Sequence, residues 1–174
     1  MSALLDAAID TFRKQKDLAE RAMVQLSDEQ LRVAFDANTN SIAVIAKHMA
    51  GNMRSRWTDF LTTDGEKPWR NRDDEFVDTF TSREQLLETW NVGWSCLFQA
   101  IEGLSESDLE KQVAIRGERL AVSLAILRQI DHYAYHVGQI VFIARILAGD
   151  NWQVLTIPRG KSREYNERVW QTPR

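Results

Sequence analysis

Three histidines are the residues of this chain whose type and spacing best suit metal chemistry. His132 and His136 stand four positions apart in the segment RQIDHYAYHVGQI, and His48 lies in an earlier apolar segment, SIAVIAKHMAGNMRSRW. Residues at positions i and i+4 of a helix share one face, with Cβ atoms about 5–6 Å apart. Two imidazoles in this arrangement can converge on one ion, with zinc–nitrogen distances of about 2.0–2.1 Å.

A third imidazole from His48 would complete a site that still has an open position. Three neutral imidazoles with one position left for water or substrate are typical of catalytic zinc sites, whereas structural sites close all four positions. An HxxxH pair is by itself a weak signal, because a histidine in an apolar helix is often a hydrogen-bonded core residue. Spacing alone does not show that His48 meets the pair, so both interpretations stay open at this point.

Polar residues near the histidines are candidates for lining such a site. Asn52 follows His48 by four residues, Gln139 follows His136 by three, and Arg56 lies two helical turns beyond His48. Arginines near a metal could bind a carboxylate or phosphate in a bidentate manner. The alternative is a solvated surface whose arginines form salt bridges with neighbouring acids. No residue is identifiable as the general base or nucleophile of a reaction.

Four long segments show the apolar periodicity of helices and would position these side chains. They cover about residues 5–26, 41–60, 82–104 and 120–147, and Ser41 and Ser82 are good N-cap types. The fourth segment is apolar nearly all round, which is typical of a helix in the middle of a bundle. The histidines therefore fall in the second and fourth expected helices.

The connections between these helices differ in length. Residues 62–81 contain Gly65 and Pro68 and are too long for a tight turn, so they indicate a crossover connection. Residues 113–122 alternate apolar and polar types around Gly117, which indicates a short hairpin-like excursion. The predicted fold is all-α: a four-helix bundle with a long crossover connection and a packed C-terminal tail, in a single domain over residues 1–174.

Composition narrows the class of protein. The 174 residues are 44% hydrophobic and 27% charged, an ordinary globular balance, and 25 acids against 22 bases give a net charge of −3. This charge offers no general attraction for nucleic acid, and no apolar run approaches the roughly 20 residues of a membrane span. Cys96 is the only cysteine, which excludes an intrachain disulfide. We expect a cytoplasmic protein that does not bind nucleic acid or membranes.

The segment DHYAYHVGQI, together with a histidine in the second helix, resembles the DinB-like (DinB/YfiT) superfamily of proposed metalloenzymes. GNMRSRWTDFLTTDGEKPWRNRD and TIPRGKSREYN are similar to a little-characterised branch of it. The resemblance covers nearly the whole chain in helix number and histidine placement. It implies a four-helix bundle that binds zinc, nickel or a similar divalent ion through His48, His132 and His136. Similar proteins include transferases that use low-molecular-weight thiols, but no motif here identifies thiol-binding residues.

Two classes of function follow from these observations. The first is a metal-dependent enzyme acting on a small-molecule substrate, of the thiol S-transferase or hydrolase type, in which the ion acts as a Lewis acid. The second is a non-catalytic metal or small-ligand binding module. Residues 152–170 combine apolar groups such as Trp152, Ile157 and Trp170 with several bases. We expect this tail to pack near the mouth of the metal site and to help form a homodimer.

Overall fold

The computed structural model describes residues 2–171, so both ends of the predicted domain, residue 1 and residues 172–174, lie outside the described residues. With η marking a 3-10 helix, the elements in chain order are α1 (Ala3–Met23), α2 (Asp28–Leu31), α3 (Ile42–Trp57), η1 (Asp73–Phe76), α4 (Arg83–Glu102), η2 (Glu106–Asp108), β1 (Gln112–Ile115), β2 (Glu118–Ala121), α5 (Val122–Ala148), η3 (Gly149–Asn151) and α6 (Ser162–Gln171). The protein is therefore mostly helical.

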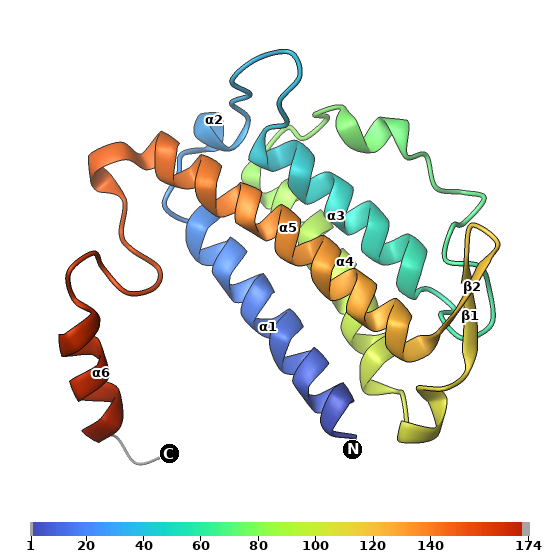
Figure 1. The fold of residues 1–174 in the computed structure, drawn as a ribbon. Helices are drawn as coiled ribbons and strands as arrows, with labels where there is room; N and C mark the ends of the chain where they lie inside the picture. Colours follow the sequence, from blue (N-terminus) through green and yellow to red (C-terminus); the bar gives the residue numbers. More distant parts are fainter. Residues whose placement is uncertain (1, 172–174) are drawn as a thin grey trace.

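The four long helices α1, α3, α4 and α5 pack side by side, and each has two of the others as neighbours. Helix α3 lies against α4 and α5, and α1 lies against α5 and α4 (Figure 1). The long segment between α3 and α4 runs back along α3 to the beginning of α4, which is the crossover connection that the sequence predicted (Figure 1). Because α3 and α5 are adjacent, side chains on their facing surfaces can meet although they are far apart in sequence.

Local sequence explains where the helices begin and end. The Ser41 hydroxyl accepts a hydrogen bond from the Val44 N–H at 3.2 Å, and α5 stops at Gly149, whose φ is 54°. Helix α3 is shorter than predicted: it ends at Trp57, and Asp59 adopts a left-handed φ of 48°. A left-handed residue cannot continue an α-helix, so the apolar pattern up to residue 60 extends past the helix itself.

An aromatic cluster lies at the centre of the core. Phe12, Trp57, Trp94 and Tyr133 are almost fully buried and come from all four long helices, and their ring centroids lie 5.8–6.4 Å from Phe12. Edge-to-face contacts at such separations add to the free energy of apolar burial. This aromatic cluster thus holds α3 and α5 together, and none of the three histidines belongs to it.

The hairpin of β1 and β2 adds a short sheet, so the all-α prediction was incomplete, although the sequence indicated an excursion here. Its two-residue turn, Arg116–Gly117, has positive φ at both positions (55° and 78°). The crossover segment binds this turn: the Asp64 carboxylate accepts from the N–H groups of Arg116 and Gly117 at 2.8 and 2.7 Å. Burial raises the pKa of Asp64, but hydrogen bonds from the backbone N–H groups of Glu66, Gly117 and Arg116 outweigh this effect and lower the pKa below its ordinary value.

The C-terminal tail packs differently from the prediction. Trp152 and Leu155 contact the core; Leu155 forms a hydrogen bond with Arg21 of α1, and Gln153 forms two with Gln25, just after α1. Helix α6 stands apart from the long helices in Figure 1, and Trp170 is 79% exposed. The described tail lies beside α1 and contributes nothing to the histidine site. None of the helices within residues 2–171 combines the length and apolar character needed to span a membrane.

Candidate metal centre

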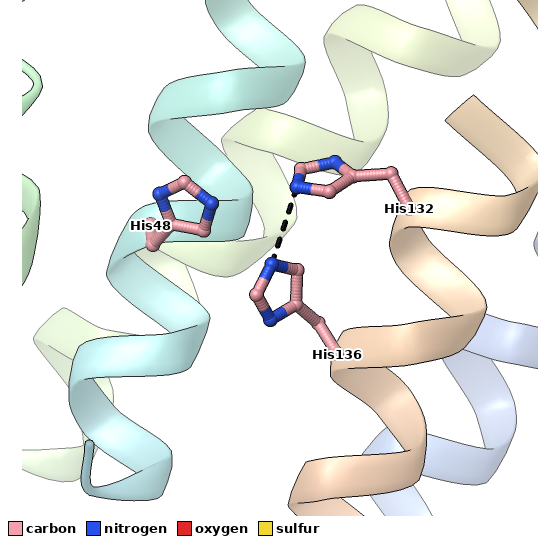
Figure 2. Close-up of side chains that lie close together, drawn as sticks. All are labelled: His48, His132 and His136. Atoms are coloured by element: carbon pink, nitrogen blue, oxygen red, sulfur yellow. Dashed lines mark hydrogen bonds between the residues drawn. The ribbon is translucent and has the colours of Figure 1, made fainter. Parts of the chain in front are cut away.

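The three histidines come together between α3 and α5. His48 lies mid-way along α3 and is 5% exposed, while His132 and His136 lie on consecutive turns of α5 and are half-buried. Their imidazoles point toward one another in Figure 2. Each offers one nitrogen, and these three atoms lie within 4.8 Å of one another. The packing of α3 against α5 therefore brings His48 to the His132–His136 pair, which sequence spacing alone could not show.

The separations suit a single ion. In a tetrahedral site with metal–nitrogen bonds of about 2.0–2.1 Å, two ligand nitrogens lie about 3.3 Å apart. The Nε2 atoms of His132 and His136 are 3.2 Å apart. The ligand nitrogen of His48 lies within 4.8 Å of those of His132 and His136. The His48 imidazole would therefore have to move by about 1.5 Å or less to reach the nitrogen–nitrogen separation of a tetrahedral site.

A buried carboxylate orients His48. The His48 Nδ1–H donates to Glu75 Oε2 at 2.9 Å, which leaves the lone pair of Nε2 available to a metal. Arg70 donates to both oxygens of Glu75, at 2.7 and 2.8 Å, and the side chains of Arg70 and Glu75 are 2% and 7% exposed. Burial raises the pKa of Glu75, but hydrogen bonds from Arg70 and His48 lower it below its ordinary value. The carboxylate therefore stays ionised and holds one tautomer of His48.

Sequence reasoning missed Glu75, which reaches His48 from η1 in the long crossover segment. The approach depends on Gly51, because a Cβ at that position would lie 2.3 Å from Oε1 of Glu75. Gly51 stands in the middle of α3, where glycine weakens a helix unless close packing requires it. This glycine, one turn after His48, was the signal in the sequence that another group comes close to the helix there.

The other two imidazoles are held less fully. Gln139 Oε1 lies 2.8 Å from His136 Nδ1, so the Nδ1–H tautomer of His136 directs Nε2 toward the cluster. In contrast, the buried Nδ1 of His132 has no hydrogen-bond partner among the described residues. Gln139, which the sequence proposed as a site-lining residue, thus acts behind a ligand rather than in the cavity.

The electrostatic surroundings keep the α5 pair neutral. Burial, with smaller effects from His136 and His48, lowers the pKa of His132 to about 3, and burial also lowers the pKa of His136. Because a metal binds the neutral imidazole, protons compete little for His132 at neutral pH. The nitrogen donors, their separations and their protonation all fit a divalent ion.

Asn52 presents its amide to the same space through a directed chain of hydrogen bonds. The indole N–H of Trp57 donates to the Tyr133 hydroxyl at 3.1 Å, and that hydroxyl is 3.0 Å from Asn52 Oδ1. The hydroxyl accepts from the indole N–H, which can only donate, and donates its own proton to the acceptor oxygen of Asn52. The NH₂ group of Asn52, for which the described residues provide no partner, is left for the cavity that Asn52 lines.

The histidines line a cavity of about 530 Å³, a volume typical of small-molecule sites. Its other lining residues are mostly polar or basic: Asn52, Arg56, Arg70, Arg72, Phe76, Arg116, Arg128, Gln129, Asp131 and Tyr135. Asn52 and Arg56, both proposed from sequence, lie in this lining. Arg56 is buried and is occupied by the Gly65 carbonyl and by the Glu66 carboxylate at 3.1 Å.

A family model described as a protein of unknown function, DUF1572, matches residues 1–161 and thus includes every element of the site. The chain belongs to the DUF1572 family. No curated protein matches the DUF1572 chain. Among solved structures, it is similar to a conserved protein of Enterococcus faecalis, with a TM-score of 0.66 and 13% identity over 86% of this chain and 99% of that one. At this identity the similarity extends to the fold alone.

The geometry of the DUF1572 protein suits an open metal site more than a closed one. Three imidazoles supply three ligands, and the space above them is a cavity rather than packed side chains. A fourth position facing a cavity is characteristic of catalytic zinc centres. Asp131, which directly precedes His132, is exposed and lines the cavity, where it is the one carboxylate among the described lining residues.

Proposed function

We propose that this DUF1572 protein is a metal-dependent enzyme that binds one divalent ion, zinc or nickel, through His48, His132 and His136. The observation that carries the proposal is the convergence of three imidazole nitrogens, from two helices, on one cavity. Glu75 and Gln139 orient two of these ligands, an arrangement usual for the outer partners of metal-bound histidines.

The ion would supply Lewis-acid chemistry, lowering the pKa of a bound water or thiol and polarising an electrophile. The chain's own residues would hold the ion, keep its ligands neutral and admit a small-molecule substrate to the cavity. Transfer of a low-molecular-weight thiol and hydrolysis both fit such a site. The resemblance of the histidine segments to DinB-like proteins favours thiol transfer.

The fold supports this assignment at a coarser level. We propose that the ring of α1, α5, α3 and α4, with its crossover connection, is a DinB-like four-helix bundle. The histidines of the second and fourth long helices lie on facing surfaces of these helices. This is the placement that the resemblance to DinB-like proteins implies. A likeness in fold does not itself imply a reaction, so the function rests on the site.

The experiment begins with protein purified without a histidine tag and analysed for bound metals. We expect about one zinc or nickel ion per chain, and none in a His132→Ala variant. The loaded protein is then assayed for conjugation of common low-molecular-weight thiols to electrophiles and for ester and amide hydrolysis. Absence of any metal after reconstitution would refute the metal site. Metal without turnover in either assay would instead identify a non-catalytic binding module.

We also propose a homodimer, with a different surface from the one first expected. Several apolar side chains on the outer surface of α5 are about half exposed or more, namely Leu124, Leu127, Tyr135, Phe142 and Ile146. Exposed apolar groups gathered on one helix are typical of interaction surfaces. Sedimentation of the parent and of a Phe142→Ser variant tests this, and a parent that sediments as a monomer at micromolar concentration would refute it.

A further inference from the structure

Three exposed arginines stand at the rim of the cavity, and each comes from a different element. Arg72 lies just before η1, Arg116 lies at the turn of the hairpin, and Arg128 lies on α5 one turn before His132. Arg56 and Arg70 also line the cavity but are buried and bound to Glu66 and Glu75. The two buried arginines therefore bind carboxylates of the cavity wall, whereas the three arginines at the rim have N–H groups available to a ligand.

The rim arginines keep unused hydrogen-bond donors. Arg116 and Arg128 each use one nitrogen, in bonds of 3.0 Å to Glu66 and Glu118, and both side chains are about half exposed. Arg72 has no ion-pair partner among residues 2–171 and lies over the ring of Phe76, 5.4 Å from its centroid. A guanidinium group has five N–H donors, so most of the donors at the rim remain free.

The balance of charge in and around the cavity favours an anion. The lining itself carries five arginines and one carboxylate, Asp131. Glu66, Glu75 and Glu118, behind the lining, form ion pairs with four of these arginines, and Asp64 binds the backbone of Arg116. Arg72 is left without an ion-pair partner among residues 2–171, and a divalent ion on the three imidazoles would add two positive charges to the cavity.

The rim is also close to the histidines. The Phe76 ring, which Arg72 covers, is itself stacked on the His48 imidazole with a centroid separation of 4.9 Å. The Phe76 ring thus contacts both Arg72 and His48. Arg72 and the three histidines line the same cavity, so a small molecule bound at Arg72 shares this cavity with the histidines.

Arg116 has an uncommon backbone conformation for a residue that is not glycine. A non-glycine residue with φ of 55° is uncommon, and such residues persist where surrounding contacts enforce them, often at functional sites. Here the Asp64 carboxylate binds the N–H groups of both turn residues, and Gly65 N–H donates to the Ala114 carbonyl at 2.8 Å. These contacts hold the arginine at the cavity rim.

We propose that the cavity binds a small molecule through a carboxylate or phosphate group, which Arg72, Arg116 and Arg128 hold while the rest of the molecule faces the three histidines. This inference deepens the proposed function, because it names the class of substrate for the same site. Planar guanidinium groups form paired hydrogen bonds with either anion, so the shared chemistry is that of a small oxyanion.

The test measures binding of inorganic phosphate and of succinate by isothermal titration at constant ionic strength, to both metal-free and nickel-loaded protein. The rim variants are Arg72→Gln, Arg116→Asn, Arg128→Gln and the triple variant; asparagine is chosen at 116 because it tolerates a left-handed backbone. Matched controls are Arg119→Gln on the same hairpin and Arg145→Gln on the same helix, both exposed and outside the described lining.

We expect saturable binding of at least one anion, weakened by about three- to tenfold in each rim variant, lost in the triple variant and unchanged in the controls. Tighter binding of one anion identifies the group that the substrate carries. No saturable binding, or equal affinity in the parent and triple variants, overturns the inference. If the parent protein binds an anion but no metal, the proposed function alone is refuted and the anion site stands. The two outcomes can be told apart because the metal-free protein is titrated separately.

Discussion

The two sides of the histidine cluster are built in different ways. On α3, His48 is buried and its Nδ1 is bound to Glu75, which Arg70 holds in turn. On α5, His132 is half-buried and its Nδ1 has no partner within the described residues, and its Nε2 contacts another imidazole. One ligand is thus fixed by the fold before any ion binds. Another, His132, has a buried Nδ1 that the described residues leave without a hydrogen-bond partner.

This difference separates stability from binding within one site. The network of His48 ties the crossover segment to α3, so it contributes to folding as well as to ligand geometry. His132 contributes little to folding, since burial of its Nδ1 without a hydrogen-bond partner is unfavourable. A site in which Glu75 and Gln139 orient two ligands, while His132 lacks such a partner, can hold its shape without metal and still adjust to the ion.

The largest expected effect comes from removing the ligands. His48→Ala and His132→Ala should each weaken metal binding by more than about 100-fold, since even partners behind a ligand contribute 10- to 100-fold. Their stabilities should differ: His48→Ala leaves Glu75 buried without one partner and should lower the free energy of unfolding by about 1–3 kcal/mol. His132→Ala should change it far less.

Metal titration and urea unfolding of the metal-free variants measure both quantities. Equal destabilisation by the two substitutions would show that the two sides do not differ as described. The parent protein should stay folded in chelator, because its core is independent of the histidines. Complete unfolding on metal removal would mean that the site is structural.

A smaller effect is expected from Glu75→Gln, which keeps the size of the side chain but removes its charge. The His48 N–H loses a charged acceptor, so metal affinity should fall by about 10- to 100-fold. Asp73→Asn is the control, because it neutralises an exposed acid in the same short helix. If both variants bind metal as the parent does, Glu75 does not orient His48.

A matched pair of glycines tests the same contact from the helix side. Gly51→Ala places a Cβ in the space of Glu75, so metal affinity should fall by about tenfold as Glu75 is displaced. Gly138→Ala, on α5 with no atom within 4 Å of its added Cβ, should raise the free energy of unfolding by up to about 1 kcal/mol. Unchanged metal affinity in Gly51→Ala would show that Glu75 can shift without consequence.

The last prediction concerns the dependence of stability on pH in the metal-free protein. The pKa of His132 is about 3 in the fold and about 6.5 in an unfolded chain, so below pH 6.5 the unfolded state binds a proton that the folded state does not. The free energy of unfolding should therefore fall between pH 6.5 and pH 5, and be unaffected by His132 above this window. Urea unfolding of His132→Asn should give a flatter profile; an identical slope would show that His132 titrates normally.

The sequence predicted the four long helices, because capping residues and apolar periodicity are local signals. Ser41, Ser82 and Gly149 mark helix ends in the structure as they did in the sequence. The convergence of His48 with the α5 pair needed the packing of α3 on α5, which spacing could not supply. Glu75 was missed because it reaches the site through an irregular segment, where no periodicity predicts which side chain turns inward. The tail was misplaced since apolar residues indicate burial without indicating where.

The chain from Trp57 through Tyr133 to Asn52 has a direction, and this direction limits what the cavity accepts. Burial raises the pKa of Tyr133, so its hydroxyl keeps its proton and goes on donating to Asn52 at any pH the protein survives. A flipped amide would turn its NH₂ group toward the hydroxyl and leave the hydroxyl proton without this acceptor. At this point of the wall a ligand therefore meets the NH₂ group of Asn52. An alcohol or carbonyl oxygen can accept from it, whereas an ammonium group would oppose one donor to another, so this position disfavours cationic groups.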